Sequence, residues 1–170
     1  IPTDDSGDDS LLDDAVNAAS RQIDAYCGRV FYADTNASAR KYFTTDRYRL
    51  HVEDFYTTTG LVVKYDDNDD GTFETTVPAA NYQTLPINSV AGGIVTTPFY
   101  IIELIASSTD EWPIDYSSNR AAIEITAKWG WSAVPEQIRQ ATLMLASELF
   151  AMRNAPLGVA GVGDFGVVNI

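Results

Sequence analysis

Cysteine and histidine are nearly absent from this sequence, which has one residue of each, Cys27 and His51, in 170 positions. A single cysteine excludes an internal disulfide and any metal site built from several cysteines. We therefore expect a protein that works in a reducing compartment or is indifferent to redox state.

Basic residues are also scarce, with 11 Lys and Arg against 24 Asp and Glu and a net charge of -13. Binding to the backbone of nucleic acids depends on lysine and arginine side chains that neutralise phosphates. The charge balance therefore excludes a general nucleic-acid-binding surface, although such a chain can lie beside DNA without binding it.

Long hydrophobic runs are missing as well, since none approaches the roughly 20 residues that a membrane-spanning helix needs. No signal-peptide pattern opens the sequence. The hydrophobic content of 45% is ordinary for a globular chain, and the length suits one domain with a sizeable core. We expect a single domain that makes no contact with a membrane.

No set of catalytic residues stands out either. His51 falls in a strand-like segment, and Cys27 falls late in a helical segment, where a small buried thiol is the common case. Neither a phosphate-binding loop nor a dinucleotide motif is present. We therefore expect no enzymatic activity and no cofactor.

Two segments have a helical pattern. Residues 10–28 form an amphipathic stretch that ends at Gly28 and follows an acidic lead-in, residues 1–9. Residues 135–153 begin at Pro135, which suits the first helical position because its missing N–H has no partner there. This second helix is apolar on nearly all sides, so it should be covered on more than one side. We expect a neighbouring subunit to provide part of that cover.

Between residues 40 and 130 the hydrophobic period changes to two, which is typical of strands. Strands are expected near residues 40–44, 48–52, 61–65, 73–77, 82–85, 99–104 and 121–129. The prediction is an α+β fold, in which the N- and C-terminal helices form a small helical core and an antiparallel β unit is inserted between them. This single domain would span residues 10–156.

The segment Asp66-Asp-Asn-Asp-Asp-Gly71 matches the first half of a calcium-binding loop. The twelfth position of such a loop should be a bidentate glutamate, and here it is Val77. The flanking segments are also strands and not helices. We interpret this segment as a solvated hairpin tip, with weak cation binding as the alternative.

The C-terminal residues 157–170 have too many glycines for a helix and too many apolar residues for a solvent-exposed linker. This composition is typical of an extended arm that becomes ordered when it adds a strand to another chain's sheet. The alternative is a terminus that folds back on its own domain.

Three motifs follow one another along the chain. The first helix ends in Gly28-Arg29-Val30-Phe31, a strand pair over residues 42–52 precedes the Asp-rich hairpin, and Trp129-Gly130-Trp131 leads through Val134-Pro135 into a helix that ends near an arginine. In this order and spacing, over residues 11 to about 156, the chain resembles the head-tail connector (adaptor or head-completion) proteins of long-tailed bacteriophages and gene-transfer particles.

The resemblance implies a ring, commonly a dodecamer, docked on the portal in the neck of the virion after assembly in the host cytoplasm. The ring would extend the DNA channel, let DNA pass without specific binding, and link the head to a stopper or tail-side neck protein. The helices would pack side by side around the ring, while the β insertion and the arm contact the portal, a neighbour or the stopper.

The candidate partner-interface residues lie late in the second helix and in the arm: Leu145, Leu149, Phe150, Met152, Arg153, Val159, Val162, Phe165, Val167, Val168 and Ile170. A further hypothesis is that Asp13, Asp14 and Asp24 face either the DNA channel or simply solvent. A negative lumen would let DNA slide because it withholds contacts from the phosphates.

Two other classes of function stay open. One is a β-rich module that binds calcium at residues 66–70 or a carbohydrate near Trp112. The other is a hydrolase, which needs two carboxylates that converge in a cleft. The carboxylates near Trp112 in the sequence are Glu103, Asp110, Glu111 and Asp115.

Overall fold

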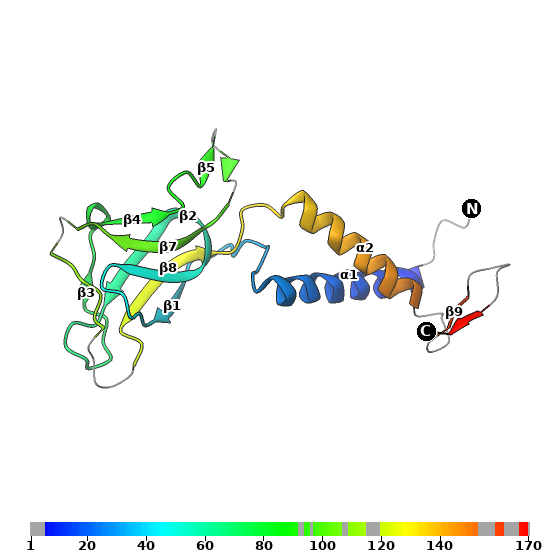
Figure 1. The fold of residues 1–170 in the computed structure, drawn as a ribbon, viewed down its shortest axis with the longest axis horizontal. Coiled ribbons are helices and arrows are strands. Elements are labelled where there is room, and N and C mark those ends of the chain that lie inside the picture. Colours follow the sequence, from blue (N-terminus) through cyan, green and yellow to red (C-terminus); the bar gives the residue numbers. More distant parts are fainter. Residues whose placement is uncertain are drawn as a thin grey trace. The chain divides into compact units, whose positions relative to one another are not determined.

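The computed structural model describes residues 6–91, 94–95, 97–106, 109–114, 120–152, 159–161 and 167–169. It confirms an α+β fold with N- and C-terminal helices and an antiparallel sheet (Figure 1). The chain divides into two compact units. Ile1–Gly28 and Pro135–Ile170 form the helical unit, and Arg29–Val134 form the sheet unit.

The sheet unit holds one six-stranded sheet, in which the strands follow the order β1-β8-β2-β7-β4 and β3 pairs with β2. A separate two-stranded ladder joins β5 to β6, and a short 3-10 helix, η1, precedes β4. The bounds are β1 Ser38–Tyr42, β2 Arg49–Tyr65, β3 Thr75–Thr76, η1 Ala79–Asn81, β4 Tyr82–Leu85, β5 Val90–Ala91, β6 Ile94–Val95, β7 Phe99–Leu104 and β8 Ile123–Trp129.

The long strand β2 organises this sheet. Its first half pairs with β7 and its second half with β8, and Phe55 is opposite both Phe99 and Trp129 where the partner changes. The register shifts between Thr57 and Val62. The sequence pattern predicted two separate strands here, but β-branched threonines keep the intervening residues extended.

The core of the sheet unit lies on one face of these strands. Along β8 the residues Ile123, Ile125, Ala127 and Trp129 are buried, whereas the residues between them are half-buried, as the alternating pattern predicted. Further buried residues come from the other strands and loops: Leu50, Phe55, Val63, Val77, Phe99, Ile102, Leu104 and Trp112. The aromatic rings of this cluster bury large apolar areas, so they are the main source of stability in the unit.

The helical unit contains α1 (Ser6–Cys27) and α2 (Glu136–Met152), which pack against each other. Helix α1 begins at Ser6, earlier than the expected Ser10. Asp8 and Asp9 then lie in its first turn, where the helix dipole favours negative charge. At the start of α2 the Arg139 N–H donates to the Pro135 carbonyl over 3.0 Å. Neither described helix is long and apolar enough to cross a membrane.

Candidate functional site

The two chain connections that leave the sheet unit are bound to each other. Residues 29–34 follow α1, and residues 130–134 precede α2. The Trp131 N–H donates to the Tyr32 carbonyl over 3.3 Å, and the Asp34 N–H donates over 2.9 Å to the carbonyl of Trp129, the last residue of β8. The rings of Phe31 and Trp131 pack with their centroids 5.4 Å apart. The two connections therefore form one local structure.

Asp54, on β2, holds both connections. Its carboxylate is 8% exposed and accepts two hydrogen bonds from Arg29 Nη1, at 3.1 and 3.2 Å. Trp131 Nε1 donates to the same carboxylate over 2.8 Å, and the Gly130 N–H donates to the Asp54 carbonyl over 2.6 Å. Charge-assisted hydrogen bonds of this kind are stronger than neutral ones. We call Arg29, Phe31, Asp54, Gly130 and Trp131 the connection cluster.

At Gly130 in this cluster, any other residue would be strained and would clash with the neighbouring backbone. Its φ is 89°, in the region that favours glycine, and a Cβ there would lie 1.8 Å from the Tyr32 carbonyl oxygen. The close approach lets the segment after Gly28 lie against the aromatic-glycine corner. Arg29 and Phe31 of the first motif thus lie close to the Trp129-Gly130-Trp131 corner of the third motif.

The predicted interface residues of α2 do not all lie at the surface. Leu145, Leu149 and Phe150 are half-buried, on the side where Ala146 is buried by the packing of the two helices. Met152 is 61% exposed. The sequence analysis gave no interface role to Leu143 and Met144, which are 49% and 70% exposed.

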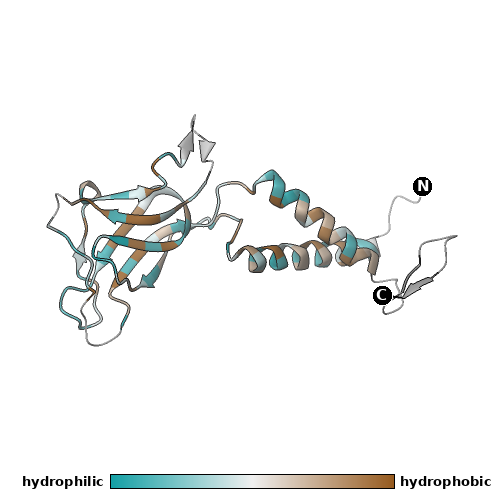
Figure 2. Cartoon of the chain, in the orientation of Figure 1, coloured by the Kyte–Doolittle hydropathy of each residue, from teal (hydrophilic) through white to brown (hydrophobic). Residues whose placement is uncertain are grey.

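Only three residues are buried in the described part of the helical unit: Ala15, Ala19 and Ala146. Because alanine is small, α1 and α2 can approach closely, and the larger apolar side chains on the same side of α2, Leu145, Leu149 and Phe150, are only half-buried. Large apolar side chains stay at the surface of both helices, and Figure 2 shows the apolar residues along them. We call this set the exposed helical residues: Leu11, Leu12, Leu143, Met144 and Met152.

In the arm, the backbone of residues 159–161 and 167–169 is described. Val159 lies in β9 (Val159–Gly161), and Val167 and Val168 lie in β10 (Val167–Asn169). These strands pair with each other in antiparallel register, so the arm is not one extended strand. The pairing of β9 with β10 provides hydrogen-bond partners for backbone N–H and C=O groups of both strands. The other predicted interface residues, Arg153, Val162, Phe165 and Ile170, lie outside the described residues.

The three acidic residues proposed for α1 differ in exposure. Asp13 and Asp14 are exposed. Asp24 is half-buried, and its carboxylate forms an ion pair with Arg21 at 3.0 Å. Asp13 and Asp14 therefore fit an outward-facing role better than Asp24 does.

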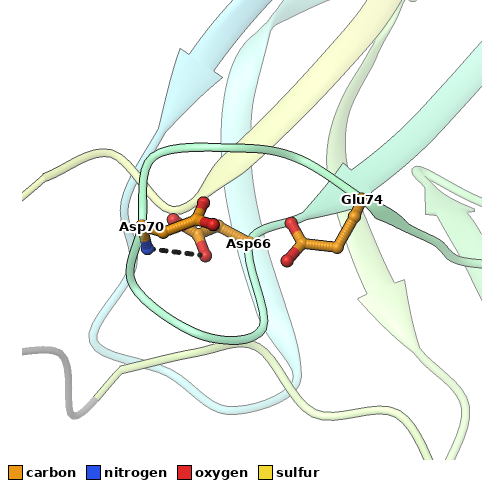
Figure 3. A group of neighbouring side chains, drawn as sticks. All are labelled: Asp66, Asp70 and Glu74. Carbon is orange, nitrogen blue, oxygen red and sulfur yellow. Dashed lines mark hydrogen bonds between the residues drawn. The ribbon is translucent and has the colours of Figure 1, made fainter.

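The Asp-rich segment forms the predicted hairpin, since Tyr65 pairs with Thr75 and Lys64 with Thr76. One carboxylate oxygen each of Asp66, Asp70 and Glu74 lies within 4.8 Å of the others, and these side chains gather inside the loop (Figure 3). Val77, at the twelfth position, is a buried core residue and offers no ligand. The loop is therefore not of the helix-flanked calcium-binding type.

The loop treats two of its carboxyl groups in opposite ways, since it stabilises the ionised form of Asp66 and disfavours that of Glu74. The Asp66 carboxylate is 1% exposed and accepts backbone N–H bonds from Asn68, Asp70 and Gly71 at 3.1, 3.3 and 2.7 Å. Burial alone would raise the pKa of Asp66, but together these hydrogen bonds outweigh it and hold the pKa below its ordinary value. For Glu74 its own backbone N–H lowers the pKa, but burial, a hydrogen bond with Asp67 and the nearby charges together raise it.

Three of the four carboxylates near Trp112 lie among the described residues, and each has a partner. Glu103 binds Arg49 and Gln83, which hold the pKa of its carboxyl below the ordinary value. Glu111 binds Arg47 at 3.0 Å and the Tyr48 hydroxyl at 3.3 Å, and Asp110 accepts a bond from Asn81 Nδ2 at 2.7 Å. Trp112 is a buried core residue, and Asp115 lies outside the described residues.

The other two residues weighed for catalysis lie in different units. His51 is exposed on β2 in the sheet unit. Cys27 ends α1 in the helical unit and is exposed, so the expectation of a buried thiol was wrong.

Comparisons with protein-family models, with curated proteins and with solved structures find no match to this chain.

Proposed function

We propose that this chain is a structural adaptor in the neck of a tailed phage or a related particle. Its copies form a ring, commonly a dodecamer, that docks on the portal, extends the DNA channel and links the head to the stopper or tail. The chain belongs to the virion and performs no catalysis of its own. The proposal rests on the resemblance of the motifs and on one structural observation, the thin core of the helical unit.

The exposed helical residues carry the proposal because the only buried residues in the described part of the helix pair are three alanines, and large side chains at the helix contact such as Leu145 and Leu149 are half-buried. In proteins most of the stability of a helix comes from the packing of its apolar face. Burying one Leu or Met side chain contributes about 1.5–3 kcal/mol. Neighbouring copies that cover Leu143, Met144 and Met152 would supply what the single chain lacks.

The charge distribution suits a channel for DNA. The net charge is -13, and Asp13 and Asp14 are exposed on α1. An acidic lumen repels the phosphates, so DNA passes without being held.

The arm suits a role in docking. Its two strands are three residues long and pair with each other. An isolated two-stranded ladder is marginally stable at best. The arm can therefore open and pair with a sheet edge of the portal, and the new backbone hydrogen bonds and apolar burial would offset the cost of ordering it.

The first experiment tests ring formation with the variant Met144→Glu. A charge at the centre of the exposed face of α2 should abolish rings in electron micrographs of the chain mixed with portal. The control is Gln137→Glu, which adds the same charge in the first turn of the same helix, at an exposed position. Rings that form equally well with both variants would contradict the proposal.

The second experiment removes residues 157–170. The shortened chain should lose attachment to the portal while its circular dichroism stays unchanged apart from the missing arm. Attachment at full strength would show that the arm has no part in docking.

A second candidate function, cation binding at the hairpin, is favoured by the proximity of Asp66, Asp70 and Glu74. Calorimetry with calcium and with a panel of glycans separates this class from the adaptor. The adaptor should show no specific heat of binding with either ligand.

A further inference from the structure

We infer that the connection cluster is a latch: Asp54 binds Arg29 and Trp131, one residue of each connection, to the sheet, and breaking its side-chain hydrogen bonds releases these two residues while the sheet stays folded. This inference goes beyond the adaptor proposal, because it concerns the single chain before any assembly.

The hydrogen bonds of Asp54 show why its role is local. Its side-chain bonds within the described part of the chain go to Arg29 and Trp131, one residue from each connection. None of them goes to another strand of the sheet. The ladders of β2 with β7 and β8 therefore do not depend on the carboxylate.

The position of Asp54 on β2 explains how one residue reaches both connections. Its neighbour Phe55 is opposite both Phe99 on β7 and Trp129 on β8, where β2 changes partners. The Asp54 carbonyl accepts the Gly130 N–H there, at the corner that follows β8. Arg29 meanwhile lies over the Tyr100 ring of β7, with its guanidinium carbon 5.5 Å from the ring centroid.

Outside the cluster, Asp34 is bound to the sheet by itself. Its N–H donates to the Trp129 carbonyl on β8 over 2.9 Å, its carbonyl accepts from the Tyr56 hydroxyl on β2 over 3.1 Å, and its carboxylate pairs with Arg40 on β1 at 3.7 Å. The Trp131 N–H bond to the Tyr32 carbonyl and the Phe31–Trp131 ring contact join one connection to the other. Asp54 therefore attaches Arg29 and Trp131 to the sheet, whereas Asp34 is attached independently of it.

A latch of this kind matters because α1 and α2 are linked to the sheet unit by these two connections alone along the chain. Closed, it fixes where the chain enters and leaves the sheet. Open, it frees Arg29 and Trp131 while the sheet core stays folded.

The test is hydrogen exchange on the full-length chain carrying Asp54→Asn, a substitution that keeps the size of the side chain and removes its charge. Exchange of the Trp131 amide should accelerate by about tenfold or more, as expected when charge-assisted bonds are lost. The Asp34 amide, which donates to the Trp129 carbonyl on β8, should keep its wild-type rate. Trypsin cleavage after Arg29 should accelerate in parallel. The amides of β7 and β8 should keep their wild-type rates up to Trp129.

The matched control is Glu53→Gln, the same chemical change at the adjacent residue. Glu53 is exposed and its partners are Tyr42 and Arg40, both on β1. Arg40 also pairs with Asp34, so Trp131 is the readout for this control, and its exchange should stay unchanged. A second variant, Trp131→Phe, keeps an aromatic ring beside Phe31 but removes the indole N–H, and should accelerate exchange of the residue 131 amide by a smaller factor.

Two results would overturn the latch. One is wild-type exchange of the Trp131 amide in Asp54→Asn. The other is equal loss of protection in β7, β8 and Trp131, which would make Asp54 a general stabiliser of the sheet. Because the measurement uses the free chain without portal, its outcome is independent of the adaptor proposal.

Discussion

The sheet unit and the helical unit obtain their stability in different ways. The sheet unit buries Leu50, Phe55, Ile102, Trp112 and Trp129 with at most 2% of each residue exposed. In the described part of the helical unit the buried side chains are those of three alanines. One chain thus combines a unit with its own core and a unit in which several large apolar side chains, such as Met144 and Met152, remain exposed.

The difference indicates which unit is stably folded in the single chain before assembly. Apolar burial contributes roughly 25 cal/mol per Å², so aromatic side chains dominate and alanines add little. The sheet unit should be folded in the single chain, whereas the helical unit should gain its stability from partners. The predictions below test this contrast, beginning with the largest effect.

The largest effect is expected on separating the two units. A chain trimmed to Arg29–Val134 should unfold cooperatively, because the whole core cluster lies within it. The two helices joined by a short flexible linker should be mostly unfolded at micromolar concentration. Circular dichroism during thermal melting measures both. A sharp melting transition in the linked helices would contradict the contrast.

The next largest effect is expected for Gly130→Ala. The new Cβ would meet the Tyr32 carbonyl oxygen, and the positive φ adds strain, so the free energy of unfolding should fall by about 3 kcal/mol or more. Gly60→Ala is the matched control, since Gly60 has a φ of 81° but nothing within 4 Å of a Cβ. It should cost only about 1 kcal/mol. Urea unfolding of both variants would contradict this explanation if the two losses were equal.

A smaller effect is expected from pH. The pKa of Glu103 is lowered in the folded state by Arg49 and then Gln83, so its stabilising contribution is present above the unfolded pKa of about 4 and is lost as pH falls toward the folded pKa. Glu103→Gln should therefore reduce stability at pH 7 by about 1 kcal/mol or less. Below the folded-state pKa of Glu103, Glu103→Gln and the wild type should have the same free energy of unfolding.

Glu74→Gln tests a carboxyl group whose pKa is raised, so the pH dependence of stability should change in the opposite direction. Because the pKa of Glu74 is raised, its ionisation in the folded state disfavours folding as pH rises through the unfolded pKa. The substitution should leave stability at pH 7 unchanged or higher. Urea unfolding at several pH values measures both variants, and the same pH dependence for the two would contradict the assigned causes.

The smallest effect is expected from calcium. The Asp66 carboxylate already accepts three backbone N–H bonds, so a millimolar cation should raise the midpoint of thermal unfolding by less than about 2 °C. Asp70→Asn is the control and should not change that shift. A rise of many degrees that disappears in Asp70→Asn would establish a cation site.

Much of the fold was predictable from the sequence because local patterns decided it. The bounds of β4 and β7 matched the expected strands, and the burial of β8 followed its alternating pattern. The continuity of β2 was missed because Thr57 to Gly60 carry no apolar alternation. The short β5 and β6 were missed because two-residue strands leave no period to detect.

The connection cluster was only half predictable. Arg29 and the Trp129-Gly130-Trp131 corner were noticed as motifs, but nothing in the spacing showed that they meet. Asp54 was missed, although an acidic residue beside the apolar Phe55 in a strand was a usable signal. Its partners are 25 and 77 positions away, and such pairings are set by sheet topology and not by local sequence.

The most direct test of the contrast between the units is hydrogen exchange of the full-length chain over a range of protein concentrations. We expect the amides of α1 and α2 to gain protection as concentration rises and copies cover the exposed helical residues, while the amides of β2 and β8 keep one rate throughout. Helices as strongly protected as the sheet at the lowest concentration would contradict the account.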